Sequence, residues 1–159
     1  MRRFFLSFIF CGFLLFFSAK TFSTNPPQFS DFPAGPAYSG PSTLANLDSP
    51  ETRQFRSILT KASLEKPNFA AHYILTSWGC GSGCSMNAII DAKNGKVFMF
   101  PFTVTAMATG EQEPVSFKLD STLVIVKGTR NEALREGTYY YKWEKGQLIL
   151  LNPPVQKNY

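Results

Sequence analysis

The sequence contains a single histidine and three cysteines, and these shortages exclude several classes of function. A structural or catalytic metal centre usually takes about four ligands from histidine, cysteine and carboxylate side chains. One histidine and two closely spaced thiols do not supply enough ligands, so we expect no metal and no other cofactor. The motifs of serine hydrolases, zinc proteases and phosphate-binding loops are also missing. The sequence therefore assigns no catalytic residue.

The net charge of the chain is also small. The formal net charge is +5 at pH 7, but Arg2, Arg3 and Lys20 lie in a segment that we expect to be removed. Without them about +2 remains, which is too little to favour nucleic acid or an anionic membrane as a partner by electrostatics.

Residues 1–23 have the three parts of a secretory signal peptide. Two arginines precede an apolar run from Phe4 to Phe17, and small residues that suit cleavage follow it. The run is shorter than the roughly 20 residues that span a bilayer. Cleavage is therefore favoured, and an uncleaved membrane anchor is the alternative. We expect a protein of the periplasm or a secreted one, which contacts the membrane only through this segment if it is kept.

Two cysteines remain after the signal, because Cys11 lies inside the apolar run. In an oxidising compartment, Cys80 and Cys84 are predicted to form a disulfide. The glycines between and beside them suit a tight ring, since glycine accepts positive φ. A ring this short shapes a loop more than it holds a fold.

Three functional interpretations of the loop Gly79–Cys84 compete with the structural one. Its backbone N–H groups could converge on a small anion, with the hydroxyls of Ser82 and Ser85 adding donors. A redox pair or a metal site would need a different spacing or more ligands. The structural loop, which can still serve as a contact surface for a partner, is the leading interpretation.

The rest of the chain predicts a leader and one domain. Residues 24–48 are rich in proline, serine and glycine and are expected to be an extended leader that lies partly across the domain. The domain spans residues 49–159. Ser49 and Pro50 predict a helix start, and Lys66 before a proline predicts its end.

Short runs rich in β-branched and aromatic residues follow the helix, with turn residues between them. We predict strands over residues 69–78, 88–91, 96–100, 115–119, 123–126, 138–143 and 147–151. Residues 103–114 and 128–137 are predicted loops. The predicted fold class is α+β, with one N-terminal helix packed on an antiparallel β-sheet of about six or seven strands.

His72, Asp91 and Trp78 are the remaining candidates near the cysteine loop. Roughly 26 Å of straight strand separate His72 from Cys80, which argues against a Cys–His nucleophile pair. Asp91 precedes a turn and is expected to bond to the backbone of that turn. Trp78 is either a contact residue for a partner protein or a core residue at the end of a strand, and the sequence leaves both open.

Two motifs carry a resemblance to a known family. The stretches Pro67–Tyr73 and Trp78–Cys84, the latter with the pattern Trp-Gly-Cys-Gly-x-x-Cys, resemble a family of small exported bacterial proteins to which no activity is assigned. Position 71 departs from that pattern, which has glycine where this chain has Ala71. The resemblance implies export and a shared fold.

Two hypotheses for the function follow. The first is a non-enzymatic binding or inhibitor module of the bacterial envelope, which contacts another envelope or extracellular protein through the residues Trp78, Gly81, Ser82, Gly83 and Ser85. The alternative is an envelope enzyme or small-anion binder that uses the loop Gly79–Cys84 as an anion or oxyanion site, with His72 or Asp91 assisting. A pocket that joins the loop to either residue would favour the alternative.

Overall fold

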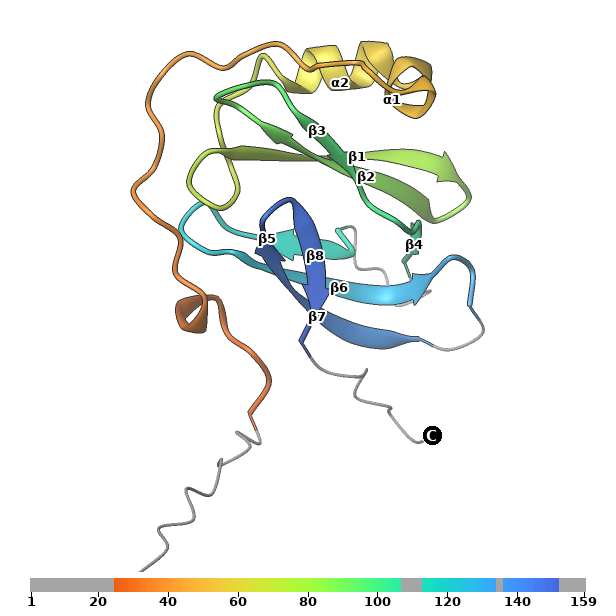
Figure 1. Cartoon of the computed structure of the whole chain (residues 1–159). Helices are drawn as coiled ribbons and strands as arrows, with labels where there is room; N and C mark the ends of the chain where they lie inside the picture. Colours follow the sequence, from red (N-terminus) through yellow and green to blue (C-terminus); the bar gives the residue numbers. More distant parts are fainter. Residues whose placement is uncertain (1–24, 107–112, 134–135, 152–159) are drawn as a thin grey trace, which may run out of the picture.

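The structure, a computed structural model, describes residues 25–106, 113–133 and 136–151. Antiparallel β-strands make up most of it, and the helices are few and short (Figure 1). This confirms the antiparallel, β-rich part of the predicted fold class. The predicted signal peptide over residues 1–23 lies outside the described residues.

Eight strands pair in the order β1-β2-β4-β6-β7-β8, with β3 also paired to β2 and β5 to β6. Their bounds are β1 (Tyr73–Gly81), β2 (Cys84–Asp91), β3 (Val97–Met99), β4 (Val104–Thr105), β5 (Val115–Phe117), β6 (Leu123–Arg130), β7 (Gly137–Glu144) and β8 (Gln147–Leu150). The sheet curls into a half-barrel, in which the half β1–β3 lies above the half β5–β8 (Figure 1). Strand β4 joins the halves because it pairs with both β2 and β6.

The single predicted helix from Pro50 to Lys66 is not confirmed. The chain instead forms α1 (Pro50–Gln54) and α2 (Arg56–Ala62), and Phe55 between them leaves helical geometry at φ −104° and ψ 23°. The helix start is as expected, because the Ser49 hydroxyl accepts a hydrogen bond from the Thr52 N–H at 3.0 Å. At the break, the Phe55 ring packs on Trp78 with centroids 5.0 Å apart.

Apolar side chains fill two layers. One layer lies between the helices and the half β1–β3 and contains Leu59, Ala62, Ile74, Ala88, Ile90 and Ala92. The other contains residues of both halves, among them Phe69, Leu75, Ile89, Val104, Val124, Val126, Tyr139, Tyr141 and Trp143. Adjacent residues such as Ile74 and Leu75 enter different layers because side chains alternate across a strand.

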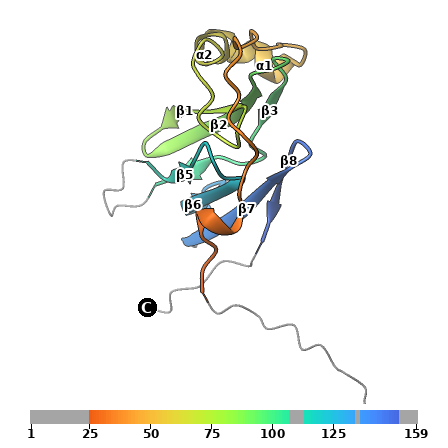
Figure 2. The same cartoon turned by 90° about the vertical axis from the view of Figure 1, so that its left-hand side faces the viewer.

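The segment before α1 is extended and is hydrogen-bonded to the domain. After a short 3₁₀ helix, η1 (Phe29–Asp31), it passes along one side of both sheet halves toward the helices (Figure 2). Thr43 N–H donates to Ala92 C=O at 2.8 Å, and Asn46 N–H donates to Gly95 C=O at 2.7 Å. Residues 42–47, called the strap below, therefore cover the turn between β2 and β3.

The sequence predicted that the first strand begins at Phe69. In the structure, β1 begins at Tyr73. Ala70 and Ala71 have φ values of 41° and 69°, and the chain turns there, with His72 N–H donating to Ala70 C=O at 2.9 Å. Left-handed backbone costs an alanine free energy that a glycine does not pay. A glycine at position 71 would suit this turn better than alanine does.

Candidate functional site

The predicted cysteine loop is the end of a long hairpin. Strand β1 continues to Gly81 and β2 begins at Cys84, so only two residues connect them. The register shifts between Gly79 and Gly81, which marks a β-bulge, and the predicted disulfide between Cys80 and Cys84 joins the two strands. We call the segment Gly79–Ser85 the hairpin tip.

The hairpin tip is exposed from Gly79 to Gly83 and fixed at its base. Gly81 and Gly83 have φ values of 139° and 69°, so both need the conformational freedom of glycine. A Cβ at Gly81 would meet no atom within 4 Å, whereas Gly83 C=O accepts from Ala106 N–H at 3.0 Å. The Ser85 hydroxyl donates to Val104 C=O at 3.4 Å. The tip is thus a projection that the disulfide and these hydrogen bonds hold at its base.

Beside the tip, the outer edge of β1 pairs with no strand of the described residues. At Leu75, nearer the start of β1, the Asn68 side chain occupies this edge. Its amide donates to Leu75 C=O at 3.1 Å, and its Oδ1 accepts from Leu75 N–H at 2.8 Å. Every second residue of a strand directs its N–H and C=O to the same edge. Ser77 and Gly79, both exposed, therefore direct theirs outward.

Trp78 lies next to the tip but faces the helices. It is half-buried, its ring contacts Phe55, and it packs with the helix-side layer. Its indole Nε1 is buried and has no hydrogen-bond partner in the part of the chain that the structure describes. The indole therefore supports the strand end, and the projecting surface consists of the tip residues after it.

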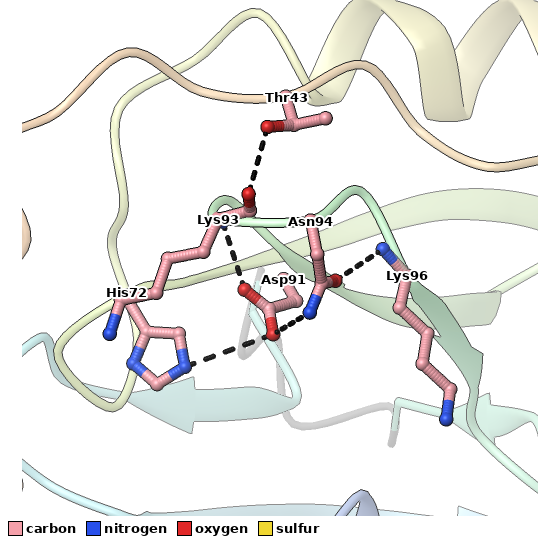
Figure 3. A network of polar contacts seen from close by, with 6 residues as sticks. All are labelled: Thr43, His72, Asp91, Lys93, Asn94 and Lys96. Atoms are coloured by element: carbon pink, nitrogen blue, oxygen red, sulfur yellow. Dashed lines mark hydrogen bonds and ion pairs between the residues drawn. The ribbon is translucent and has the colours of Figure 1, made fainter.

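His72 and Asp91 meet at the other end of the same hairpin (Figure 3). His72 Nε2 lies 3.9 Å from Asp91 Oδ2. The buried Asp91 carboxylate accepts from Lys93 N–H and from the Asn94 side-chain amide, both at 2.9 Å. This confirms that Asp91 bonds to its own turn.

The charge state of His72 follows from this position. Burial lowers the pKa of His72, the nearby Asp91 carboxylate raises it, and Lys93 lowers it. The imidazole also packs on the Tyr73 ring, with centroids 4.1 Å apart. Burial is the largest of these effects, so the neutral imidazole is favoured, and His72 acts as a packed neighbour of the Asp91 turn.

The structure does not bring His72 or Asp91 to the tip. Tyr73 pairs with Asp91 at one end of the β1–β2 ladder and Gly81 pairs with Cys84 at the other. In Figure 1 these are opposite ends of the hairpin. Two hollows among the described residues, one beside Trp143 and one beside Arg130, include neither a tip residue nor His72. The arrangement that a catalytic role of the tip with either residue would need is not present.

Sequence reasoning missed a polar hollow beside Arg130. Its volume is about 270 Å³, and it is lined by Pro101, Phe102, Arg130, Asn131, Ala133 and Tyr139. The sequence placed Arg130 in a loop, whereas it ends β6 and its guanidinium carbon lies 3.9 Å from the centroid of the Tyr139 ring. The available signal was the arginine followed by tyrosines at alternate positions 139 and 141 of the next predicted strand.

Comparison of the chain with family models, curated proteins and solved structures finds no match. The family resemblance therefore remains a prediction. Within residues 25–106, 113–133 and 136–151, no group of three or more histidine, cysteine or acidic side chains is placed to hold a metal ion. No helix in these ranges is long and apolar enough to cross a membrane.

Proposed function

We propose that this protein is a non-enzymatic binding or inhibitor module of the bacterial envelope, exported by its N-terminal signal to the periplasm or the exterior. Its contact surface is the hairpin tip, and its partner is another envelope or extracellular protein. The observation that supports this most is an exposed, disulfide-closed hairpin end. The adjoining strand edge directs outward the backbone groups of Ser77 and Gly79, which pair with no other strand among the described residues.

Strand addition is the binding mode that such an edge favours. An extended segment of a partner pairs with an open strand edge through main-chain hydrogen bonds. Gly79 has no side chain to hold that segment away, and Asn68 blocks the edge at Leu75, which limits the partner to the tip end. Because the Cys80–Cys84 disulfide fixes the tip before binding, little conformational entropy is lost on association.

The small-anion alternative has less support at the tip. The hydroxyl of Ser85, which would add a donor to an anion site, already donates to Val104 C=O. The hydroxyl of Ser82 stands on an exposed residue at the turn, where water competes for any anion. The tip therefore fits a protein surface better than it encloses a small ion.

A matched pair of substitutions at Gly79 tests the proposal. Gly79→Pro removes the N–H that the edge offers, whereas Gly79→Ala keeps it and adds a Cβ whose nearest atom is Cys84 C=O at 4.0 Å. Edge strands tolerate proline where the N–H faces solvent. The mature, oxidised proteins are immobilised and used to capture envelope and extracellular proteins.

We expect at least one protein to be recovered by wild type and by Gly79→Ala in equal amounts. Its recovery should fall about tenfold with Gly79→Pro, which loses one hydrogen bond and the pairing next to it. Ser82→Glu, at the apex of the tip, should also reduce recovery. Thermal unfolding checks that all variants are folded. Recovery of the same proteins in the same amounts by every folded variant would refute the proposal.

A further inference from the structure

Arg130 is held in a fixed position by three aromatic side chains. Its guanidinium carbon lies 3.9 Å from the centroid of the Tyr139 ring and 5.7 Å from that of Phe102, and its Nη1 donates to the Tyr141 hydroxyl at 2.5 Å. Stacking on aromatic faces suits the flat guanidinium. The edge of the guanidinium, which carries its donors, is thereby oriented before any ligand arrives.

The donors of Arg130 are incompletely used. Its Nε is buried and has no hydrogen-bond partner among the described residues, and no carboxylate of these residues forms an ion pair with it. Tyr141 does not neutralise its charge, because burial raises the pKa of that phenol, although Arg130 acts to lower it. Arg130 is half-buried, and a cationic group that loses part of its water is favoured by an anionic partner.

Asn131 adds a second donor at the same hollow. Its Oδ1 accepts from Thr103 N–H at 3.0 Å, which orients the side chain and leaves its amide nitrogen for another partner. Asn131 and Glu132 have φ values of 51° and 56°, and left-handed backbone at residues other than glycine is often kept at functional sites. Asparagine adopts this backbone region more readily than most residues, and the turn places Asn131 at the hollow.

We propose that the hollow beside Arg130 binds a carboxylate carried by a flat or apolar group. The carboxylate accepts a charge-assisted hydrogen bond from Nη2 of Arg130, the terminal nitrogen that does not bond Tyr141. The amide of Asn131 donates to the same group, while Pro101 and Phe102 border its body. At about 270 Å³, the hollow is smaller than a typical drug-sized site of roughly 300–1,000 Å³, so the ligand is compact.

Two sources supply this chemistry, namely a small free carboxylic acid and the carboxyl terminus of a peptide that ends in an apolar residue. The probes are benzoate, its neutral counterpart benzyl alcohol, and a short peptide ending in phenylalanine, with either a free or an amidated terminus. Each is titrated into the mature, oxidised protein and followed by NMR at Arg130 Nε–H and at the amides of Asn131 and Tyr139. This site does not depend on the proposed role of the hairpin tip.

We expect saturable shifts with benzoate and with the free-terminus peptide at concentrations up to tens of millimolar, and no saturation with benzyl alcohol or the amidated peptide. Tighter binding of the peptide identifies a chain terminus as the ligand, and equal or tighter binding of benzoate identifies a small acid. Arg130→Gln should weaken binding by at least about tenfold, since a charge-assisted pair is lost. Arg130→Lys should weaken it less, because lysine keeps the charge without the fork.

Arg56→Gln is the matched control, because Arg56 is exposed on α2 and its loss makes the same change in net charge. It should leave binding unchanged. Equal shifts with benzoate and benzyl alcohol in the wild-type protein, or no saturation with any carboxylate probe, would overturn the proposal even if the Arg130 variants failed to fold. A folded Arg130→Gln variant that binds benzoate as wild type does would also overturn it.

Discussion

The strap over the β2–β3 turn can be tested through Gly95. This glycine has a φ of 75°, and a Cβ built on it would overlap the carbonyl group of Leu44 in the strap. Gly95→Ala must therefore displace the strap backbone or the turn beneath it. The substitution separates the contribution of the strap from the remainder of the fold.

The expected loss in the free energy of unfolding has two contributions. Left-handed backbone costs an alanine about 1 kcal/mol relative to glycine. Displacing the strap breaks the hydrogen bonds from Asn46 to Gly95 and from Thr43 to Ala92, at about 1 kcal/mol each. Gly95→Ala should therefore lower the free energy of unfolding by about 3 kcal/mol.

Gly83→Ala is the control. Its φ of 69° is close to that of Gly95, but its Cβ would lie at an ordinary 3.6 Å from Ala106 C=O. It should cost only the backbone term, about 1 kcal/mol. Urea unfolding of both variants measures the difference, and limited proteolysis should cut the strap faster in Gly95→Ala. Equal losses in the two variants would refute the inference that the strap contributes to stability.

Three further predictions concern other parts of the molecule. Burial lowers the pKa of His72, so the folded chain binds that proton less readily than the unfolded chain, whose value is about 6.5. Stability should therefore fall as pH drops below about 6.5, and His72→Gln should flatten this fall in urea unfolding. Replacing Cys80 and Cys84 by serine should cost roughly 2 kcal/mol, because the ring is short, and should leave the circular dichroism spectrum unchanged; an unfolded variant would contradict this. Gly128→Ala should cost more than about 3 kcal/mol in thermal unfolding, since φ is 132° and a Cβ would overlap Thr105 C=O; a loss under about 1 kcal/mol would contradict the close approach of β4 and β6.

Features that depend on neighbouring residues could be predicted from the sequence. The turn with Asn94 and Gly95 and the one with Lys145 and Gly146 connect β2 to β3 and β7 to β8, as the sequence indicated. The glycine of each turn has a positive φ, 75° at Gly95 and 80° at Gly146, which glycine adopts readily. The cap at Ser49 and the disulfide ring are equally local. Each is determined by a few residues in succession.

Features that depend on distant contacts could not be predicted. Strand β4 has two residues, and its position is decided by pairing with β2 and β6. The helix is interrupted at Phe55, whose ring packs on Trp78, a residue of β1. Strand β6 extends to Arg130, through residues that the sequence predicted to be a loop. This extension lets the Arg130 guanidinium stack on Tyr139 and border the hollow.

The register also decides how the two proposed surfaces relate. Ser85 at the tip pairs with Val104, and Val104 pairs with Arg130. Two strand spacings place the backbones of Ser85 and Arg130 about 10 Å apart, so both surfaces lie at one end of the molecule. A standard protein interface, which buries about 800 Å² on each side, is large enough to cover both. If a captured partner is lost with Arg130→Gln as well as with Gly79→Pro, the carboxylate belongs to that partner. If it is lost with Gly79→Pro alone, the hollow serves a separate small ligand, and the tip contacts the partner without it.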